Sequence, residues 1–270
     1  MENGLKEKQS VLGDLSIRLL SYAQMKQITI ARTGDFTYAL RINRTQERNL
    51  LSRLAKSGFI IRLRRGVYLI PNQIPSGGRY NPGTAYILEK LFEDLEGQYQ
   101  LCGPSCFNLY GFDEQIPNVW HIYNNKISDT RTIAGRNFVF IKVQNKRLGS
   151  VKHIDTDSGS TLIYSSKLRT LVDAVYDWWR FQSIPRAYQW IQETCKDKNT
   201  IDEFIDLTIR FGNQSTIRRI GFILEKKASA KSNLDRLACS LTSSRSLIPL
   251  IPESENKGKT DAKWGIIQNG

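Results

Sequence analysis

A cluster of proline and glycine at residues 71–83 constrains the fold more than any other feature of this sequence. Proline lacks a backbone N–H and glycine lacks a side chain, so a dense cluster of both interrupts helices and strands and is typical of a linker. With 270 residues, the chain is long enough for a small domain joined to a larger one. We therefore expect a domain at residues 1–72, a linker at 73–83 and a second domain at 84–270. The cluster consists of Pro71, Pro75, Gly77, Gly78, Pro82 and Gly83.

The stretch before the linker has the pattern of three helices. Leucines spaced by three and four residues predict a first helix that ends near Met25, and a second, short helix is expected at residues 33–40. Asn43 is a suitable N-cap for a third helix over residues 45–56, which Gly58 stops.

The third helix is expected to have one apolar and one polar side. At 100° per residue, Leu50, Leu51 and Leu54 share a side, and Thr45 and Asn49 lie opposite with their polar neighbours. An α-helix fits the major groove of B-DNA, and Asn, Gln and Arg side chains can pair bidentately with base edges. We therefore expect the polar side to contact double-stranded DNA.

A basic β-hairpin is expected directly after the third helix. Two short runs rich in β-branched and aromatic residues, at 59–63 and 67–70, flank the basic turn Arg64-Arg65-Gly66. In the wing position of a winged helix-turn-helix, such a hairpin can place guanidinium groups against phosphates or in the minor groove. The DNA-contacting residues expected from helix and wing together are Arg44, Thr45, Gln46, Arg48, Asn49, Ser52, Arg53, Lys56, Arg62, Arg64 and Arg65.

The charge distribution agrees with this expectation. The chain has a net charge of +13, and residues 1–80 contain 14 Lys and Arg against 5 Asp and Glu. Such an excess attracts polyanions. In the alternative interpretation, the third helix is an ordinary amphipathic surface helix. The arginines of the hairpin then only keep its exposed edge strand from pairing with another strand. The order of three helices and a basic hairpin favours the DNA-binding interpretation.

Beyond the linker, the patterns predict an α+β domain rather than alternating β–α–β units. Helical spacing dominates residues 166–228, and the last part of the chain is expected to contain another helix and two strands. The expected fold class is therefore α+β, with an N-terminal winged helix-turn-helix followed by a larger mixed α+β domain. The expected elements before residue 166 are helices at 83–95 and 104–110 and strands at 119–123, 138–143 and 160–164.

Four segments spread over most of the chain are similar to one known family. They are residues 63–68 (LRRGVY), 101–112 (LCGPSCFNLYGF), 165–173 (SSKLRTLVD) and 217–225 (IRRIGFILE). In these segments the chain resembles the AbiEi-like antitoxins, transcriptional regulators of phage-defence systems. The resemblance implies a winged helix domain before a larger C-terminal domain, binding to inverted repeats in the chain's own promoter, and autorepression. It also implies a type IV antitoxin that counters a nucleotidyltransferase-like toxin, with no stable complex assumed.

Two of these segments contain a candidate basic face in the C-terminal domain. In the structural interpretation, Ser165 or Ser166 caps a helix in which Arg169 and Asp173 pair at i and i+4. In the functional interpretation, the basic residues contact nucleic acid or the toxin's RNA target. The structural interpretation is favoured. The residues of the candidate face are Lys167, Arg169, Arg218, Arg219, Lys226 and Lys227.

No arrangement of residues in the sequence points to catalysis. His121 and His153 are the two histidines, and neither belongs to a metal-binding motif. Gly77-Gly78 lacks the Lys-Ser/Thr pair of a phosphate-binding loop. We therefore expect a protein that is not an enzyme and has no metal or cofactor.

The cysteines and the aromatic clusters are expected to have structural roles. Cys102 and Cys106 have no second pair or histidine beside them, so they are expected to be small buried residues. Trp178-Trp179 and Tyr188 with Trp190 are expected to pack between helices rather than to stack on single-stranded bases.

Two alternatives to a DNA-binding regulator remain open. A Mg²⁺-dependent nuclease could be built from Asp155, Asp157 and Asp173, although the first two fit a turn before a strand. A protein-interaction module could bind an acidic partner through the basic front. In each case the chain is expected to be cytoplasmic, because no apolar run is long enough to span a membrane and no signal peptide is recognisable.

Overall fold

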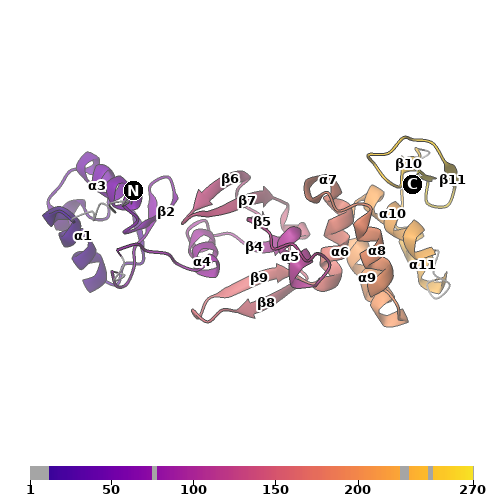
Figure 1. Cartoon of the computed structure of the whole chain (residues 1–270), viewed down its shortest axis with the longest axis horizontal. Helices are drawn as coiled ribbons and strands as arrows, with labels where there is room; N and C mark the ends of the chain where they lie inside the picture. The colour runs from indigo at the N-terminus through magenta and orange to yellow at the C-terminus, as the bar shows by residue number, and fades with distance from the viewer. Residues whose placement is uncertain (1–11, 75–77, 226–230, 243–245, 270) are drawn as a thin grey trace, which may run out of the picture. The chain divides into compact units, whose positions relative to one another are not determined.

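The structure of the chain, a computed structural model, describes residues 12–74, 78–225, 231–242 and 246–269 (Figure 1). Within these residues the fold is mixed α+β and contains three separate sheets. The chain divides into two compact units. Unit 1 comprises the described residues up to Glu96 together with residues 131–137 and 156–160, and unit 2 comprises the others. The expected domain limits at residues 72 and 84 stay a prediction.

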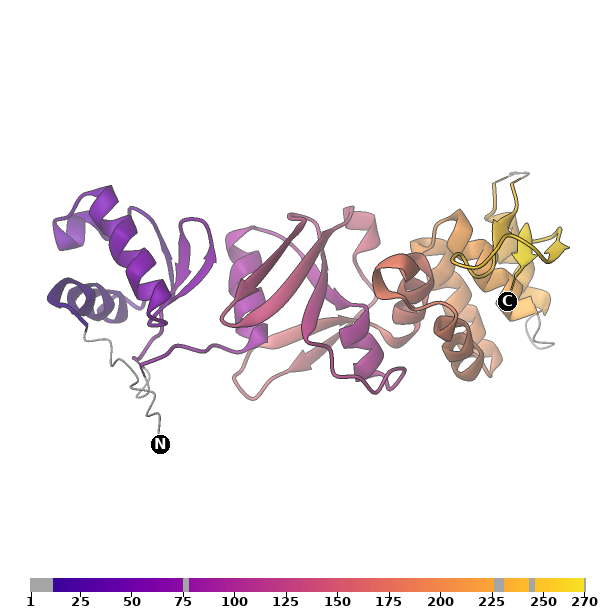
Figure 2. The same cartoon turned by 45° about the horizontal axis from the view of Figure 1, so that its top comes forward.

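Unit 1 begins with three helices and a three-stranded antiparallel sheet. The strand order is β1-β3-β2, and β2 and β3 form a hairpin. Both views show α1 and α3 on the same side of this hairpin (Figure 1 and Figure 2). The elements are α1 (Asp14–Met25), β1 (Ile30–Arg32), α2 (Thr37–Leu40), α3 (Arg44–Lys56), β2 (Ile61–Arg64), β3 (Val67–Leu69) and α4 (Thr84–Asp94).

The core of unit 1 is built from the apolar sides of its helices. Leu19 and Leu20 of α1 pack with Leu50, Leu51 and Leu54 of α3 in one buried cluster. Burying each leucine side chain stabilises the fold by about 1.5–3 kcal/mol. The expected apolar side of the third helix is confirmed.

The hairpin reverses direction at Arg65-Gly66. Gly66 has φ +77°, in the left-handed region that favours glycine, and the register shifts by a bulge between Arg62 and Arg64. The expected hairpin with a basic turn is thereby confirmed.

Unit 2 combines a sheet with a group of helices. The largest sheet, most of which belongs to this unit, has the order β6-β7-β5-β4-β9-β8, and β4 and β9 run parallel. A small sheet has the order β10-β12-β11. Helices α6, α8, α9 and α10 lie side by side (Figure 1) and provide most of the buried core of this unit. The elements are β4 (Tyr99–Cys102), α5 (Pro104–Leu109), β5 (Val119–Asn124), β6 (Asp129–Ile133), β7 (Arg136–Lys142), β8 (Val151–Asp155), β9 (Thr161–Ser165), α6 (Lys167–Tyr176), α7 (Trp178–Phe181), α8 (Arg186–Thr194), α9 (Lys198–Phe211), α10 (Gln214–Glu225), α11 (Lys231–Cys239), β10 (Ile248–Pro249), β11 (Lys259–Asp261) and β12 (Ile266–Gln268).

The helices and strands expected from the sequence are present, and short strands were missed. Among the described residues, the strands missed are β1, β4, β6, β8 and β11, of three to five residues each. The second helix is shorter than expected because its first residues form a turn, in which the Asp35 carboxylate accepts from the backbone N–H of Arg32 at 2.7 Å. Over the described ranges, no helix has the length and apolar character needed to cross a bilayer.

Candidate nucleic-acid interface

The polar side of α3 is exposed, as expected. On the opposite side, Leu50, Leu51 and Leu54 are at most 2% exposed. The helix is therefore packed along one side, and its polar side chains are accessible to solvent. The exposed residues are Arg44, Thr45, Gln46, Arg48, Asn49, Arg53 and Lys56, and Ser52 is half-buried.

The first turn of α3 is closed by a reciprocal pair of hydrogen bonds. Asn43 Oδ1 accepts from the backbone N–H of Gln46 at 2.9 Å, and Gln46 Oε1 accepts from the backbone N–H of Asn43 at 3.0 Å. This capping box confirms Asn43 as the N-cap, and such caps contribute about 0.5–2 kcal/mol. It also holds the side-chain oxygen of Gln46 at the first turn of the helix, and the side-chain NH₂ of Gln46 can donate to a base.

Glu47 is an important residue of α3 that the sequence pattern did not single out. Its buried carboxylate accepts from the backbone N–H of Gly34 at 2.6 Å and from that of Phe36 at 2.7 Å. Because these amides directly precede α2, the carboxylate ties α3 to the start of α2. One signal was available: Glu47 lies three and four positions before Leu50 and Leu51, on the apolar side of the helix.

Arg64, one of the residues expected to contact DNA, forms an ion pair with α4. Its Nε donates to Oδ2 of Asp94 at 2.5 Å, and Nη2 of Arg32 donates to Oδ1 of the same carboxylate at 2.8 Å. The Asp94 side chain is 0% exposed, and that of Arg64 is 37% exposed. The expected contact of Arg64 with DNA stays a prediction. The Arg64 guanidinium links the hairpin to α4. This ion pair offsets the cost of burying the Asp94 carboxylate.

The other cations of this region keep their charge unpaired. Among the described residues, no salt bridge involves any of the cations on the exposed side of α3, nor Arg62 and Arg65 of the hairpin, both of which are exposed. Such charges attract phosphates over about 8 Å at physiological salt. We call this set the α3–hairpin surface. Its cations are Arg44, Arg48, Arg53, Lys56, Arg62 and Arg65.

Tyr38 of α2 adds an aromatic ring that sequence reasoning missed. It is 96% exposed, and with Arg41 and Asn43 it lines a hollow next to the start of α3. An exposed tyrosine presents an apolar ring and a hydroxyl that can contact sugar and phosphate. The short α2 buries only Leu40, so its helical spacing is too brief to reveal an exposed side.

Comparisons with known proteins bear on the fold and leave the family open. No protein-family model matches the chain, and no curated protein matches its sequence. Among solved structures, the chain is similar to the crystal structure of the RV2827C protein from Mycobacterium tuberculosis. The two are 13% identical, the alignment covers 95% of this chain and 92% of that chain, and the TM-score is 0.54. At this identity the likeness shows a shared fold.

Arg169, expected on a basic face of the C-terminal domain, is completely buried. Its Nε donates to Asp173 Oδ1 at 2.9 Å, and its Nη2 donates to the backbone carbonyl of Arg147 at 2.8 Å. The pairing of Arg169 with Asp173 at i and i+4 confirms the structural interpretation, and Ser166 caps the helix. A contact of Arg169 with nucleic acid is wrong, because its donors face protein acceptors.

Arg218 and Arg219 are also buried, at 6% exposure each. Arg218 donates to the carbonyl of Ser246 at 2.7 Å, and Arg219 donates to the carbonyl of Pro249 at 3.2 Å. These bonds attach α10 to β10 and to the residues just before it, so the expectation of a basic face is wrong for both residues. Lys167 is exposed, as that expectation requires. Lys226 and Lys227 lie outside the described residues.

The three carboxylates considered for a nuclease do not form one site. Asp173 is fully buried, and its Oδ1 accepts from Arg169 and from Arg147 Nη2 at 2.9 Å each. Asp155 Oδ1 accepts from Thr161 Oγ1 at 2.8 Å. Within the described ranges, no group of three or more His, Cys, Asp or Glu residues is close enough to hold a metal ion. The geometry therefore gives the nuclease interpretation no support.

The cysteines and histidine considered for chemistry are packed into unit 2. Cys102 and Cys106 are completely buried, as expected, and burial raises the pKa of the Cys106 thiol to about 12. His121 packs edge-on against Phe181 with the ring centres 5.6 Å apart, and burial lowers its pKa. The raised pKa keeps the Cys106 thiol protonated at neutral pH, so this thiol is not poised as a nucleophile.

The aromatic clusters divide into a packed pair and one exposed ring. Trp190 stacks on Phe112 at 5.5 Å, and the buried Tyr188 donates to a backbone carbonyl, so packing is confirmed for both. Trp179 is 57% exposed, with the Arg180 guanidinium 4.4 Å from its ring centre. The expectation of packing is wrong for Trp179.

Proposed function

We propose that the first part of unit 1 is a winged helix-turn-helix that binds double-stranded DNA, with α3 as the recognition helix and the β2–β3 hairpin as the wing. The observation that carries this proposal is the α3–hairpin surface. It combines six exposed cations, which have no ion pair within the described residues, with Thr45 and Asn49 on a capped helix that packs along its opposite side. Bidentate contacts from Asn and Arg read base edges, and the cations hold phosphates.

The wing and the helix have different tasks in this proposal. Arg62 and Arg65 neutralise phosphates and so set affinity and its dependence on salt, whereas Asn49 and Arg48 discriminate between base pairs. Arg64 acts indirectly, because its bond to Asp94 holds the wing in position. Tyr38 extends the contact to the backbone beside the start of α3.

We further propose that the chain is a transcriptional autorepressor and the antitoxin of a phage-defence operon, countering a nucleotidyltransferase-like toxin. This role is supported by the resemblance to AbiEi-like antitoxins and by the proposed DNA-binding surface. A repressor of this kind binds inverted repeats in its own promoter, where two copies meet two half-sites. A stable complex with the toxin is not part of the proposal.

A gel-shift titration tests DNA binding directly. The DNA upstream of the chain's own gene is compared with a random duplex of equal length at about 100 mM salt, where phosphate attraction is partly screened. We expect clearly tighter binding to the upstream DNA. Equal affinity for both duplexes would contradict a repressor and would favour a module whose basic surface binds an acidic protein.

Co-expression tests the antitoxin role separately. A nucleotidyltransferase encoded beside this gene is expected to arrest growth when expressed alone and to be tolerated when this chain is present. Continued arrest in the presence of the chain would refute the antitoxin role and leave DNA binding unaffected.

A further inference from the structure

One carboxylate in unit 1 binds two arginines beside the hairpin turn. Asp94, the last residue of α4, accepts from Nε of Arg64 at 2.5 Å and from Nη2 of Arg32 at 2.8 Å. The Asp94 side chain is 0% exposed, whereas the side chains of Arg32 and Arg64 are 61% and 37% exposed. Two arginines that solvent reaches therefore share a single buried negative charge.

Both arginines lie at the end of the sheet where the hairpin turns. Arg32 of β1 and Arg64 of β2 are each paired with Val67, the residue that follows Gly66. The turn between Arg64 and Val67 contains Arg65, an exposed cation of the α3–hairpin surface. The shared carboxylate is therefore bonded to the direct neighbour of a residue that we propose to neutralise phosphate.

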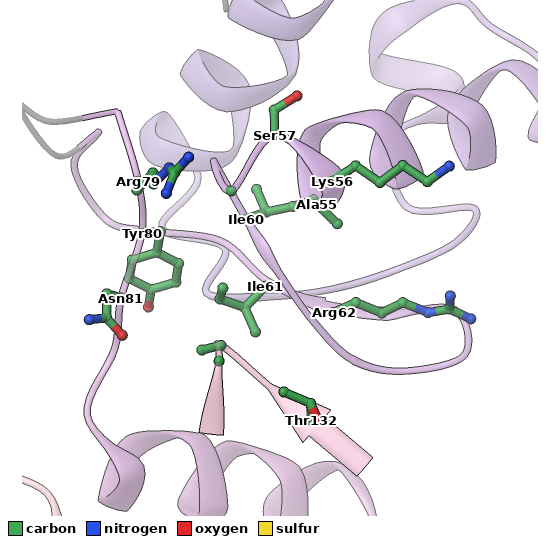
Figure 3. A pocket seen from close by; sticks show the side chains of 13 residues that line it. Ala55, Lys56, Ser57, Ile60, Ile61, Arg62, Arg79, Tyr80, Asn81 and Thr132 are labelled. Atoms are coloured by element: carbon green, nitrogen blue, oxygen red, sulfur yellow. The ribbon is translucent and has the colours of Figure 1, made fainter. Parts of the chain in front are cut away.

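Arg64 lies on the less buried side of β2. Burial alternates along this strand, because Ile61 and Leu63 are buried whereas Arg62 and Arg64 are at least partly exposed. Figure 3 shows the side chain of Arg62 extending to the same side as that of Lys56, at the end of α3. The side of the strand to which Arg64 belongs thus already bears a cation of the α3–hairpin surface.

The bonds to Asp94 leave donors of both guanidinium groups unused. Within the described ranges, the side chains of Arg32 and Arg64 have no printed hydrogen bond or salt bridge besides those to Asp94. A guanidinium carries several N–H donors, so each arginine can also donate to a phosphate oxygen. What the carboxylate removes is positive charge rather than access.

From this arrangement we propose that Asp94 is an internal competitor of DNA phosphate at the wing, an inference that rests on the proposed function. Its carboxylate neutralises part of the charge of Arg32 and Arg64 and so limits the affinity for every duplex. Carboxylates and phosphates form the same charge-assisted bonds with a guanidinium. Asp94 therefore sets the strength of phosphate binding and leaves base recognition by α3 unaffected.

Other contacts hold the hairpin when the carboxylate charge is removed. The strands β2 and β3 pair in an antiparallel ladder, and Arg131 Nη1 donates to the backbone carbonyl of Leu63 at 3.2 Å. Loss of the charge is therefore expected to release the two arginine side chains rather than the strand. It also removes a negative charge that repels phosphate, so both effects increase the attraction to DNA.

Gel-shift titration of Asp94→Asn at several salt concentrations tests the competition. Asparagine keeps the size of the side chain and one acceptor oxygen, and it removes the charge. At about 100 mM salt we expect about tenfold tighter binding, to upstream and random DNA alike, for each arginine that gains a phosphate. The salt slope should become steeper by about one unit for each of these contacts. A partly unfolded variant cannot produce this result, because unfolding lowers the apparent affinity.

Two further variants assign the gain to the arginines. Glu96→Gln removes an exposed carboxylate two positions after Asp94, one without a salt bridge in the part of the chain that the structure describes. This matched control should change the affinity much less than Asp94→Asn does. Adding Arg32→Ala and Arg64→Ala to Asp94→Asn should abolish both the tighter binding and the steeper slope.

Three results would overturn the competition. One is an unchanged affinity of Asp94→Asn. Another is a lower affinity of this variant with an unchanged circular dichroism spectrum, which would mean that the carboxylate orients the arginines toward DNA. The last is an equal gain in Glu96→Gln, which would reduce the effect to net charge. In each case the unchanged chain still binds upstream DNA, and the proposed function stands. If neither the unchanged chain nor Asp94→Asn binds any duplex, the proposed function fails and this inference fails with it.

Discussion

The Nε of Arg64 donates to the carboxylate of Asp94 at 2.5 Å, across thirty residues of sequence. This bond distinguishes the two arginines of the hairpin turn, because Arg65 is exposed and has no such partner within the described ranges. Identical neighbours in the sequence therefore have different roles.

We predict that Arg65→Ala weakens binding to all duplexes similarly and lowers the salt slope by about one unit, as loss of one phosphate contact should. Arg64→Ala should instead lower the stability of unit 1, because it leaves Asp94 with Arg32 alone. The measurements are gel shifts at several salt concentrations and urea unfolding. An equal change of salt slope in both variants would show that Arg64 also reaches phosphate.

Asn49→Ala should reduce selectivity more than affinity. The Asn49 side chain lies on the exposed side of α3 and can pair bidentately with adenine, a contact worth about 1–3 kcal/mol of discrimination. The ratio of dissociation constants for upstream and random DNA measures it. Arg18→Ala, an exposed cation of α1 outside the α3–hairpin surface, is the control and should leave the ratio unchanged. A ratio unchanged in Asn49→Ala would remove this residue from base recognition.

Glu47→Ala should destabilise the fold by about 2–4 kcal/mol, because it leaves the half-buried N–H of Gly34 and the buried N–H of Phe36 without acceptors and opens a cavity. Glu47→Gln keeps one acceptor and should cost less. Urea unfolding followed by circular dichroism provides the values. The exposed Arg44→Ala is the control and should change stability by less than about 0.5 kcal/mol. Equal stabilities of Glu47→Ala and the unchanged chain would show that the carboxylate does not hold α2.

Asp173→Ala should be among the most damaging single changes in unit 2. It leaves the guanidinium groups of Arg147 and Arg169 without their shared carboxylate, and breaking a buried ion pair costs about 3–5 kcal/mol. Arg169→Lys should also destabilise unit 2, yet leave DNA affinity unchanged at a temperature where the variant is folded. A loss of DNA affinity in folded Arg169→Lys would restore the nucleic-acid role that its burial argues against.

The native chain should show slow thiol chemistry at three of its four cysteines. Cys102, Cys106 and Cys195 are buried, and Cys239 is exposed. With the pKa of Cys106 raised to about 12 by burial, its thiolate fraction at pH 8 is on the order of 10⁻⁴. Titration with a thiol reagent should therefore detect one rapidly reacting thiol per native chain and four per unfolded chain. A fast second equivalent would mean that the core around Cys106 opens readily.

Local patterns in the sequence predicted α3 and the hairpin closely. Leucine spacing, the Asn43 cap and the Gly66 turn depend on residues near one another in the chain, so they can be recognised without a fold. The exposure of Asn49 and the burial of Leu51 follow from the same spacing.

Contacts between distant residues could not be predicted in this way. The pairing of Arg64 with Asp94 and the bonds from Arg218 and Arg219 to distant carbonyls depend on tertiary structure. The sequence pattern therefore suggested an exposed basic face for Arg218 and Arg219, whereas the structure buries both side chains. The burial of Glu47 was missed for a related reason, since its partners, Gly34 and Phe36, are backbone groups of another segment.

The division into two units also separates the chain's fluorophores. All five tryptophans lie in unit 2, at positions 120, 178, 179, 190 and 264, whereas the aromatic residues of α1 to α4 are tyrosine and phenylalanine. Tryptophan emission therefore follows the melting of unit 2 alone. If the circular dichroism signal of the helices falls while this emission is unchanged, unit 1, which contains the α3–hairpin surface, has unfolded. The unfolding of the two units can therefore be followed separately without any label.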